Sequence, residues 1–154
     1  MTEAIRELLA GHAFTRRFWP EHVARLAGMA SEARFEPGEL IFQEGDHSSL
    51  FYLLIEGKVA LEVVPAGRTL RVATLYPGDV LGWSSIASED GKQFQARALE
   101  PVYALAFDGA RLRHACEEDY AFGFALVRAV LHVTSERLHA IRAQLLEAYT
   151  PVSP

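Results

Sequence analysis

Cysteine, long apolar runs and excess positive charge are all scarce in this sequence, and each scarcity excludes a class of protein. The single cysteine, Cys116, excludes an internal disulfide and is typical of a reducing compartment. No apolar run approaches the roughly 18 residues of a membrane span. Charged residues at positions 3, 6 and 7 interrupt the first apolar residues, so no secretory signal is predicted. We therefore expect a cytoplasmic protein without a membrane partner.

The charge balance gives no reason to expect nucleic acid as a direct partner. The formal net charge is −5 at pH 7, and the sequence has no basic stripe that would attract phosphates. Half of the 154 residues are hydrophobic and 23% are charged, which is typical of a globular protein rather than a disordered one. The length is that of a single domain, 1–154.

No residue pattern for catalysis or metal binding stands out. His114, Cys116 and Glu117 are close in sequence, but at helical spacing His114 and Cys116 point to different faces. A metal site needs three or four converging ligands. No Ser/His/Asp order, paired carboxylates or Walker loop is visible either. We therefore predict no metal site, no catalytic residues and no enzyme activity.

The apolar periodicity changes twice along the chain and predicts the architecture. It is helical over residues 1–32, alternates with period two over 33–107, and is helical again over 108–149. Short strands with glycine turns between them are typical of an antiparallel roll. We predict a mainly β fold, an antiparallel, jelly-roll-like β-roll with N-terminal helices and a long C-terminal helix. The expected strands are 33–36, 39–43, 50–55, 58–64, 68–75, 79–81, 93–99 and 102–107.

Residues 75–86 and their continuation at 92–98 read as a strand end, a glycine turn, a very short helix and a returning strand. Gly82 supplies backbone freedom at the turn, and Ser84 and Ser85 are helix-capping residues. Such a turn gathers backbone N–H groups and favours an anion. The alternative is an ordinary corner with a serine cap. Residues 88–91 are predicted to form a polar loop.

Three segments in this order carry a family resemblance. They are residues 37–46 (PGELIFQEGD), 51–59 (FYLLIEGKV) and 75–82 (LYPGDVLG). Together they resemble the cyclic-nucleotide-binding domain, the sensor half of the bacterial Crp/Fnr regulators and the regulatory module of some kinases and channels. The resemblance implies a regulatory, signal-transducing β-roll with cAMP or cGMP as its ligand.

The phosphate-binding cassette departs from the family pattern. The resemblance implies a glutamate for a ribose hydroxyl, an arginine for the phosphate and a small residue beside it. Trp83, Lys92 and Phe94 take these positions. A lysine lacks the bidentate fork of an arginine, and the two rings fill volume. The candidate ligand-binding residues are Gly82, Trp83, Ser84, Ser85, Lys92, Gln93 and Phe94.

We therefore expect weak or absent binding of cyclic nucleotides at this cassette. A small anion or a more apolar ligand is the remaining possibility for it. The alternative function is a ligand-independent dimerisation or protein-interaction module, in which Trp83 and Phe94 close the pocket.

The C-terminal helix, expected over 118–149 and ended by Pro151, has a seven-residue apolar register. Such a register predicts a homodimer through a coiled-coil seam. The alternative is one broad stripe lying on its own domain. Arg137 and Arg142 are expected at flanking positions, where they would repel across a parallel pair. The seam residues are Phe124, Val127, Leu131, Thr134, Leu138, Ile141 and Leu145, with Ala148 continuing it. A second set is expected to face the roll: Phe122, Leu126, Val130 and Val133.

The Crp/Fnr regulators carry a helix-turn-helix after this long helix. Residues 149–154 are too short for a recognition helix and its support. Any role in transcription is therefore expected to pass through an unknown protein partner, unless the chain is a fragment of a longer regulator.

Overall fold

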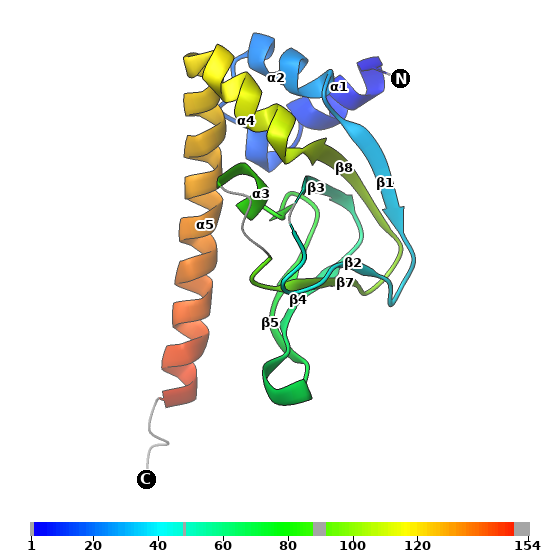
Figure 1. Ribbon diagram of the computed structural model, residues 1–154, viewed down its shortest axis with the longest axis vertical. Helices are drawn as coiled ribbons and strands as arrows, with labels where there is room; N and C mark the ends of the chain where they lie inside the picture. Colours follow the sequence, from blue (N-terminus) through cyan, green and yellow to red (C-terminus); the bar gives the residue numbers. More distant parts are fainter. Residues whose placement is uncertain (1, 48, 88–91, 150–154) are drawn as a thin grey trace.

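Two antiparallel sheets form the body of the protein (Figure 1). The structure, a computed structural model, describes residues 2–47, 49–87 and 92–149. The sheet orders are β1-β8-β3-β6 and β2-β7-β4-β5, and all of their pairings are antiparallel. The strands are β1 (Ser31–Phe35), β2 (Leu40–Phe42), β3 (Leu50–Glu56), β4 (Val59–Val63), β5 (Leu70–Leu75), β6 (Val80–Leu81), β7 (Gln95–Ala98) and β8 (Val102–Asp108). The predicted mainly β roll is confirmed.

Helices precede and follow the roll, as the change of period predicts. Pro20 begins its helix at the first position, where a missing N–H costs nothing. Asp108 caps α4 by accepting hydrogen bonds from the N–H groups of Ala110 and Arg111, at 2.8 and 3.2 Å. The helices are α1 (Thr2–Ala10), η1 (Ala13–Thr15), α2 (Pro20–Ala27), η2 (Pro65–Gly67), α3 (Ser84–Ala87), α4 (Gly109–Glu118) and α5 (Tyr120–Tyr149).

Strand β3 separates two hydrophobic clusters because its side chains alternate between its two faces. Phe51 and Leu53 belong to the helical cluster, which packs the outer face of one sheet against the helices. Tyr52 and Leu54 belong to the roll cluster, which fills the space between the two sheets. Any ligand inside the roll must compete with this second cluster.

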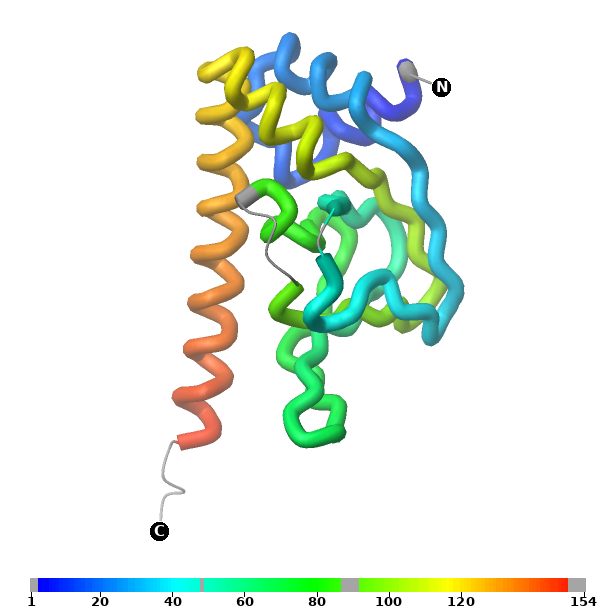
Figure 2. Tube along the Cα trace, viewed as in Figure 1, coloured from blue at the N-terminus to red at the C-terminus, as the bar shows by residue number. Residues whose placement is uncertain are grey.

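The first half of α5 packs against α4 and the N-terminal helices, and its second half runs past the roll, beside the β4–β5 hairpin (Figures 1 and 2). Phe122 and Leu126 are fully buried, and Val130 and Val133 pack against the helical cluster. The prediction was that this set faces the roll. The set is covered by the rest of the chain, but Phe122 packs against Phe18 and His22 of the N-terminal segment rather than against the roll alone. No helix in the described residues is long and apolar enough to cross a bilayer.

The predicted polar loop at 88–91 and the predicted helix stop at Pro151 lie outside the described residues.

Candidate functional site

The candidate cassette begins where β6 ends at Gly82. This residue has φ +74°, a region that side chains with a Cβ rarely adopt. A Cβ at Gly82 would also lie 2.6 Å from the carbonyl oxygen of Leu50 and 2.5 Å from Nζ of Lys92. Glycine is therefore required here both for the turn and for the close approach of two other segments.

Some of the hydrogen-bond donors of the short helix α3 bond to carbonyls at its own start. The N–H and Oγ of Ser85 both donate to the carbonyl of Gly82, at 3.0 and 2.9 Å, and the Ile86 N–H donates to the Trp83 carbonyl at 3.0 Å. The carbonyl of Ser85 in turn accepts from Nη1 of Arg113. Two of the amides that would otherwise face an anion are thus paired, while Ser84 is half-buried beside them.

Lys92 brings a buried positive charge into the cassette. Its Nζ donates to the carbonyls of Leu50 and Gly82 at 3.2 and 3.3 Å, and it lies 4.7 Å from the ring centroid of Phe42. The residue is only 5% exposed. Burial lowers the pKa of Lys92 from 10.5 to about 8, against the opposing effect of the negative charge on Asp46. Backbone oxygens thus hold the ammonium at the position where the resemblance implies an arginine that binds the phosphate.

The two aromatic residues of the cassette go to different places. Phe94 packs against the roll cluster, as expected for a ring that occupies the pocket. Trp83 packs against the helical cluster instead, so the expectation that it helps to close the roll is wrong. The chain leaves the sheet at Gly82, and the next side chain turns toward the helices. Gln93 is exposed.

The sequence interpretation missed the role of Arg137. Its Nη2 donates to the carbonyl of Val80 in β6 at 3.0 Å. Burial lowers the pKa of Arg137, and the nearby negative charge of Asp79 opposes this. The expectation that Arg137 flanks a dimer seam is therefore wrong, because it turns onto its own roll. A signal was available, since 137 continues the roll-facing spacing of 130 and 133.

A second polar contact lies on the face of the β4 sheet away from the roll cluster. The buried carboxylate of Glu62 accepts from Nε2 of Gln95 at 2.8 Å and from Nε of Arg97 at 3.3 Å. Arg97 also donates to the carbonyl of Gly38 at 3.0 Å. Arg97 is thus engaged on the outer face, and it does not replace the missing arginine of the cassette.

His114 and Cys116, considered above as metal ligands, have different surroundings. His114 is exposed and pairs with Glu118 at 3.6 Å. Cys116 is half-buried, and burial raises the pKa of its thiol. No group of three potential ligands converges in the part of the chain that the structure describes.

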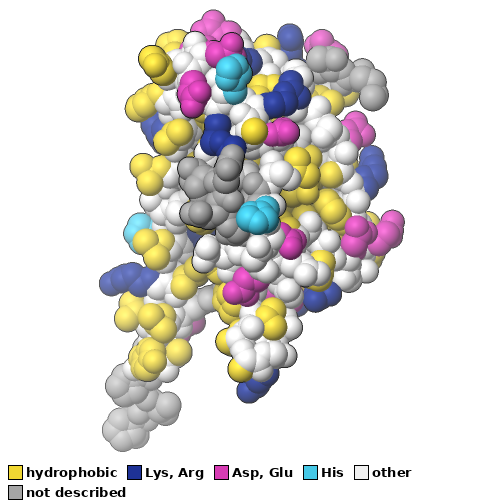
Figure 3. All heavy atoms as spheres, in the orientation of Figure 1, with side chains coloured by type: hydrophobic (Ala, Val, Ile, Leu, Met, Phe, Trp, Pro, Cys, Tyr) yellow, Lys and Arg dark blue, Asp and Glu magenta, His cyan; other side chains and the backbone are white. Residues whose placement is uncertain are grey.

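The predicted seam on α5 is largely uncovered by the rest of the chain. Phe124, Leu131 and Leu138 are each 64–65% exposed, and hydrophobic side chains gather along α5 in the space-filling view (Figure 3). Thr134 and Ile141 are half-buried. The alternative, in which this stripe lies on its own domain, is therefore wrong for these three exposed positions.

The chain is similar in sequence to proteins of one family. The family model described as "Cyclic nucleotide-binding domain" matches residues 32–119. The CRP-like cAMP-activated global transcriptional regulator of Mycobacterium tuberculosis is 28% identical over 108 residues, which cover 70% of this chain and 48% of that protein. The chain thus spans about half the length of this curated relative.

Solved structures agree with the family match. The N-terminal domain of a transcriptional regulator from Streptomyces coelicolor is 26% identical with a TM-score of 0.70, covering 87% of this chain and 94% of that one. A cyclic nucleotide-binding domain from Methylobacillus flagellatus has a TM-score of 0.86 at 15% identity, covering 99% and 88%. The second likeness concerns the fold alone.

Proposed function

The chain belongs to the cyclic nucleotide-binding domain family, and we propose that it is a regulatory module whose divergent cassette binds cAMP and cGMP weakly or not at all. The observation that carries the proposal is the buried ammonium of Lys92, which is hydrogen-bonded to the carbonyls of Leu50 and Gly82. A cyclic phosphate would have to draw this lysine away from both oxygens. It would do so without the two-pronged contact that an arginine offers.

The missing partners should lower the affinity of the cassette for cyclic nucleotides by a large factor. A missing charge-assisted hydrogen bond costs about 1.5–3 kcal/mol. The cassette lacks two such partners, because Lys92 replaces the arginine and Trp83 replaces the carboxylate that would accept a ribose hydroxyl. Losing both weakens a micromolar site by roughly two to four powers of ten. Phe94, packed against the roll cluster, must also be displaced.

Titration calorimetry with cAMP and cGMP tests the proposal. The wild type should bind neither at micromolar concentration, and Trp83→Glu combined with Lys92→Arg should gain at least about tenfold in cAMP affinity. Lys58→Arg makes the same lysine-to-arginine change at the other lysine of the chain, which is exposed, and should have no effect. Micromolar binding of cAMP by the wild type would contradict the proposal.

We also propose that the chain is one domain that pairs with a second copy through the exposed seam of α5. The support is the exposure of Phe124, Leu131 and Leu138 and the stripe in Figure 3. In this proposal the module works in the cytoplasm and signals to a protein partner rather than to nucleic acid. The net charge of −5 agrees with that choice.

The second candidate is a ligand-independent dimerisation or protein-interaction module on the same fold. It is favoured by Phe94 and the roll cluster, which together occupy the space between the sheets. Thermal unfolding separates the two candidates. A ligand present at a hundred times its Kd adds about 2.7 kcal/mol of stability. If neither cyclic nucleotides nor small anions such as phosphate raise the midpoint, the second candidate is the better one.

A further inference from the structure

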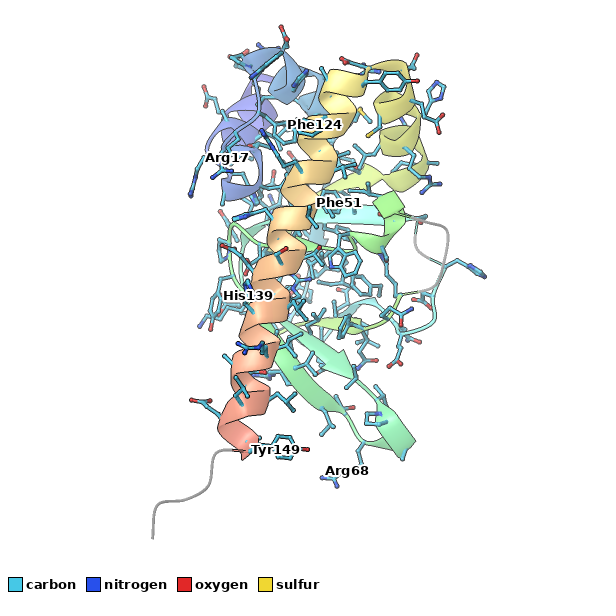
Figure 4. All side chains as sticks on the ribbon, turned by 90° about the vertical axis from the view of Figure 1, so that its left-hand side faces the viewer. Arg17, Phe51, Arg68, Phe124, His139 and Tyr149 are labelled. Carbon is cyan, nitrogen blue, oxygen red and sulfur yellow. The ribbon has the colours of Figure 1, made fainter. Side chains whose placement is uncertain are left out.

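A groove of about 560 Å³ lies outside the roll, between α5, the residues around η1 and the turn from β5 to β6. We call it the α5 groove. Its floor includes Phe14, Phe18, Ala129 and Val133, and Arg17 lies beside the upper part of α5 (Figure 4). The groove contains none of the cassette residues, so it is a separate place on the molecule.

The α5 groove is positively charged on an acidic protein. Four arginines (16, 17, 128 and 137) and two acids (Asp79 and Glu136) line it, which gives four minus two, or +2, with His132 neutral. The whole chain carries −5. A concentration of cations against the net charge attracts anions to this one place.

Three of these arginines are available to a ligand. Arg137 is engaged with the carbonyl of Val80. Arg16, Arg17 and Arg128 are exposed, and no carboxylate of the described residues pairs with them. The guanidinium of Arg128 lies over the ring of Phe124, 5.1 Å from its centroid, which leaves its N–H groups able to meet an anion. Both acids of the groove have other partners.

The carboxylate of Asp79 accepts a hydrogen bond from the Tyr76 N–H at 2.7 Å. That of Glu136 lies 3.3 Å from Nε2 of His132. Each acid of the groove thus has a partner other than the guanidinium groups of Arg16, Arg17 and Arg128.

The floor of the groove is apolar. Phe14 is buried, and Phe18, Ala129 and Val133 pack against the helical cluster as its partly covered edge. The volume lies within the range of small-molecule sites, which bury most of a ligand against apolar walls with a few polar contacts.

We propose that the α5 groove binds an amphiphilic anion, a molecule with one carboxylate or phosphate head and an apolar tail. The head pairs with Arg16, Arg17 and Arg128 at the rim, because guanidinium groups match these anions in bidentate geometry. The tail lies on Phe18 and Val133. This proposal is independent of the cassette and of the function proposed for it.

The groove stays open if α5 also pairs with a second copy. At about 100° per residue, the groove positions 125, 129, 132 and 136 are turned away from the seam positions 131, 138 and 145. Arg128 lies between the two sets, over the ring of Phe124. The apolar tail of a ligand therefore does not compete with a partner on the seam, and only the contact with Arg128 lies next to it.

Calorimetric titration of the full chain with decanoate, below its micelle concentration, tests the proposal. Saturable binding is expected, weakened at least about tenfold by Arg17→Gln with Arg128→Gln. Arg68→Gln with Arg142→Gln makes the same charge change at exposed positions outside the groove and should leave the affinity unchanged. Figure 4 shows Arg17 beside the upper part of α5 and Arg68 near the lower end of the molecule.

Ala129→Trp fills the floor while keeping every arginine, and it should abolish binding. Should this variant fail to fold, the paired arginine variants still decide the matter. The proposal is overturned if the arginine pair binds decanoate like the wild type, or if uncharged decanol binds as tightly. It is also overturned if the protein binds anionic phospholipid vesicles but not monomeric decanoate, since that result indicates a membrane surface.

Discussion

The buried ammonium of Lys92 should make folding stability rise with pH in a window that this one residue defines. Its pKa is about 8 in the folded protein, against 10.5 when unperturbed. Between these values the unfolded chain holds a proton that the folded chain has lost, so stability increases as pH rises. Below about pH 8 both states are protonated, and the full cost of burying the charge is present.

The magnitude follows from the two pKa values. A difference between 10.5 and about 8 corresponds to about 3 kcal/mol gained across the window. Lys92→Met removes the titrating group. It therefore removes both this gain at high pH and the cost of burying the charge at neutral pH. The same substitution leaves the carbonyls of Leu50 and Gly82 without their donor, at a cost of about 1–3 kcal/mol. The change in absolute stability at neutral pH is therefore small, and the pH dependence is the diagnostic quantity.

Urea unfolding at about pH 7, 8, 9 and 10 measures the effect as a difference between the wild type and Lys92→Met. Titrations of tyrosines and of Cys116 are common to both proteins and cancel. Lys58→Met is the matched control, because Lys58 is exposed. The difference in the free energy of unfolding between the wild type and Lys92→Met should grow with pH, and it should grow more than the difference for Lys58→Met.

A direct measurement is also within reach, because the chain has only two lysines. Labelling with 13Cε lysine yields two side-chain signals, one for each residue, and their shifts report each pKa as pH is raised. If the Lys92 signal titrates near the ordinary lysine value, or if the stability difference between the wild type and Lys92→Met is flat with pH, the burial of the Lys92 charge is refuted.

Further predictions concern the helix seam and the two contacts around β6. Leu138→Glu puts a charge in the proposed apolar seam and should shift sedimentation from dimer toward monomer; a monomeric wild type at micromolar concentration would contradict the seam. Gly82→Ala should cost about 1–3 kcal/mol more than Gly67→Ala, because both glycines have positive φ but only Gly82 is crowded; equal losses in urea unfolding would show that the crowding is relieved. Arg137→Gln removes the donor to the β6 backbone and should lower the free energy of unfolding by about 1–3 kcal/mol. Arg142→Gln, which is exposed, should stay within about 0.5 kcal/mol of the wild type, and similar effects of the two would count against the contact.

Much of the fold could be predicted from the sequence because its signals are local. The short apolar, β-rich run at residues 50–55 predicts β3, and the structure confirms it at Leu50–Glu56. The roll-facing spacing of Phe122 and Leu126 likewise predicts which side of α5 is buried. An apolar period of two indicates a strand, a period of 3.6 indicates a helix, and each shows which face of the element is apolar. They therefore predict the elements and their inner faces without knowledge of the segments that pack against them.

The details of the site depended on contacts between distant segments. The turn at Gly82 decides which way the Trp83 side chain points. Either of the two apolar clusters could accept its ring, and it packs against the helical cluster. The pKa of Lys92 was decided by burial against Leu50 and Gly82, since a lysine in sequence carries no mark of its desolvation. Arg137 found its partner in Val80, 57 residues away. The α5 groove has no sequence signal at all, because two separate segments supply its arginines and its floor, a third supplies the β5–β6 turn beside them, and only their packing brings the three together.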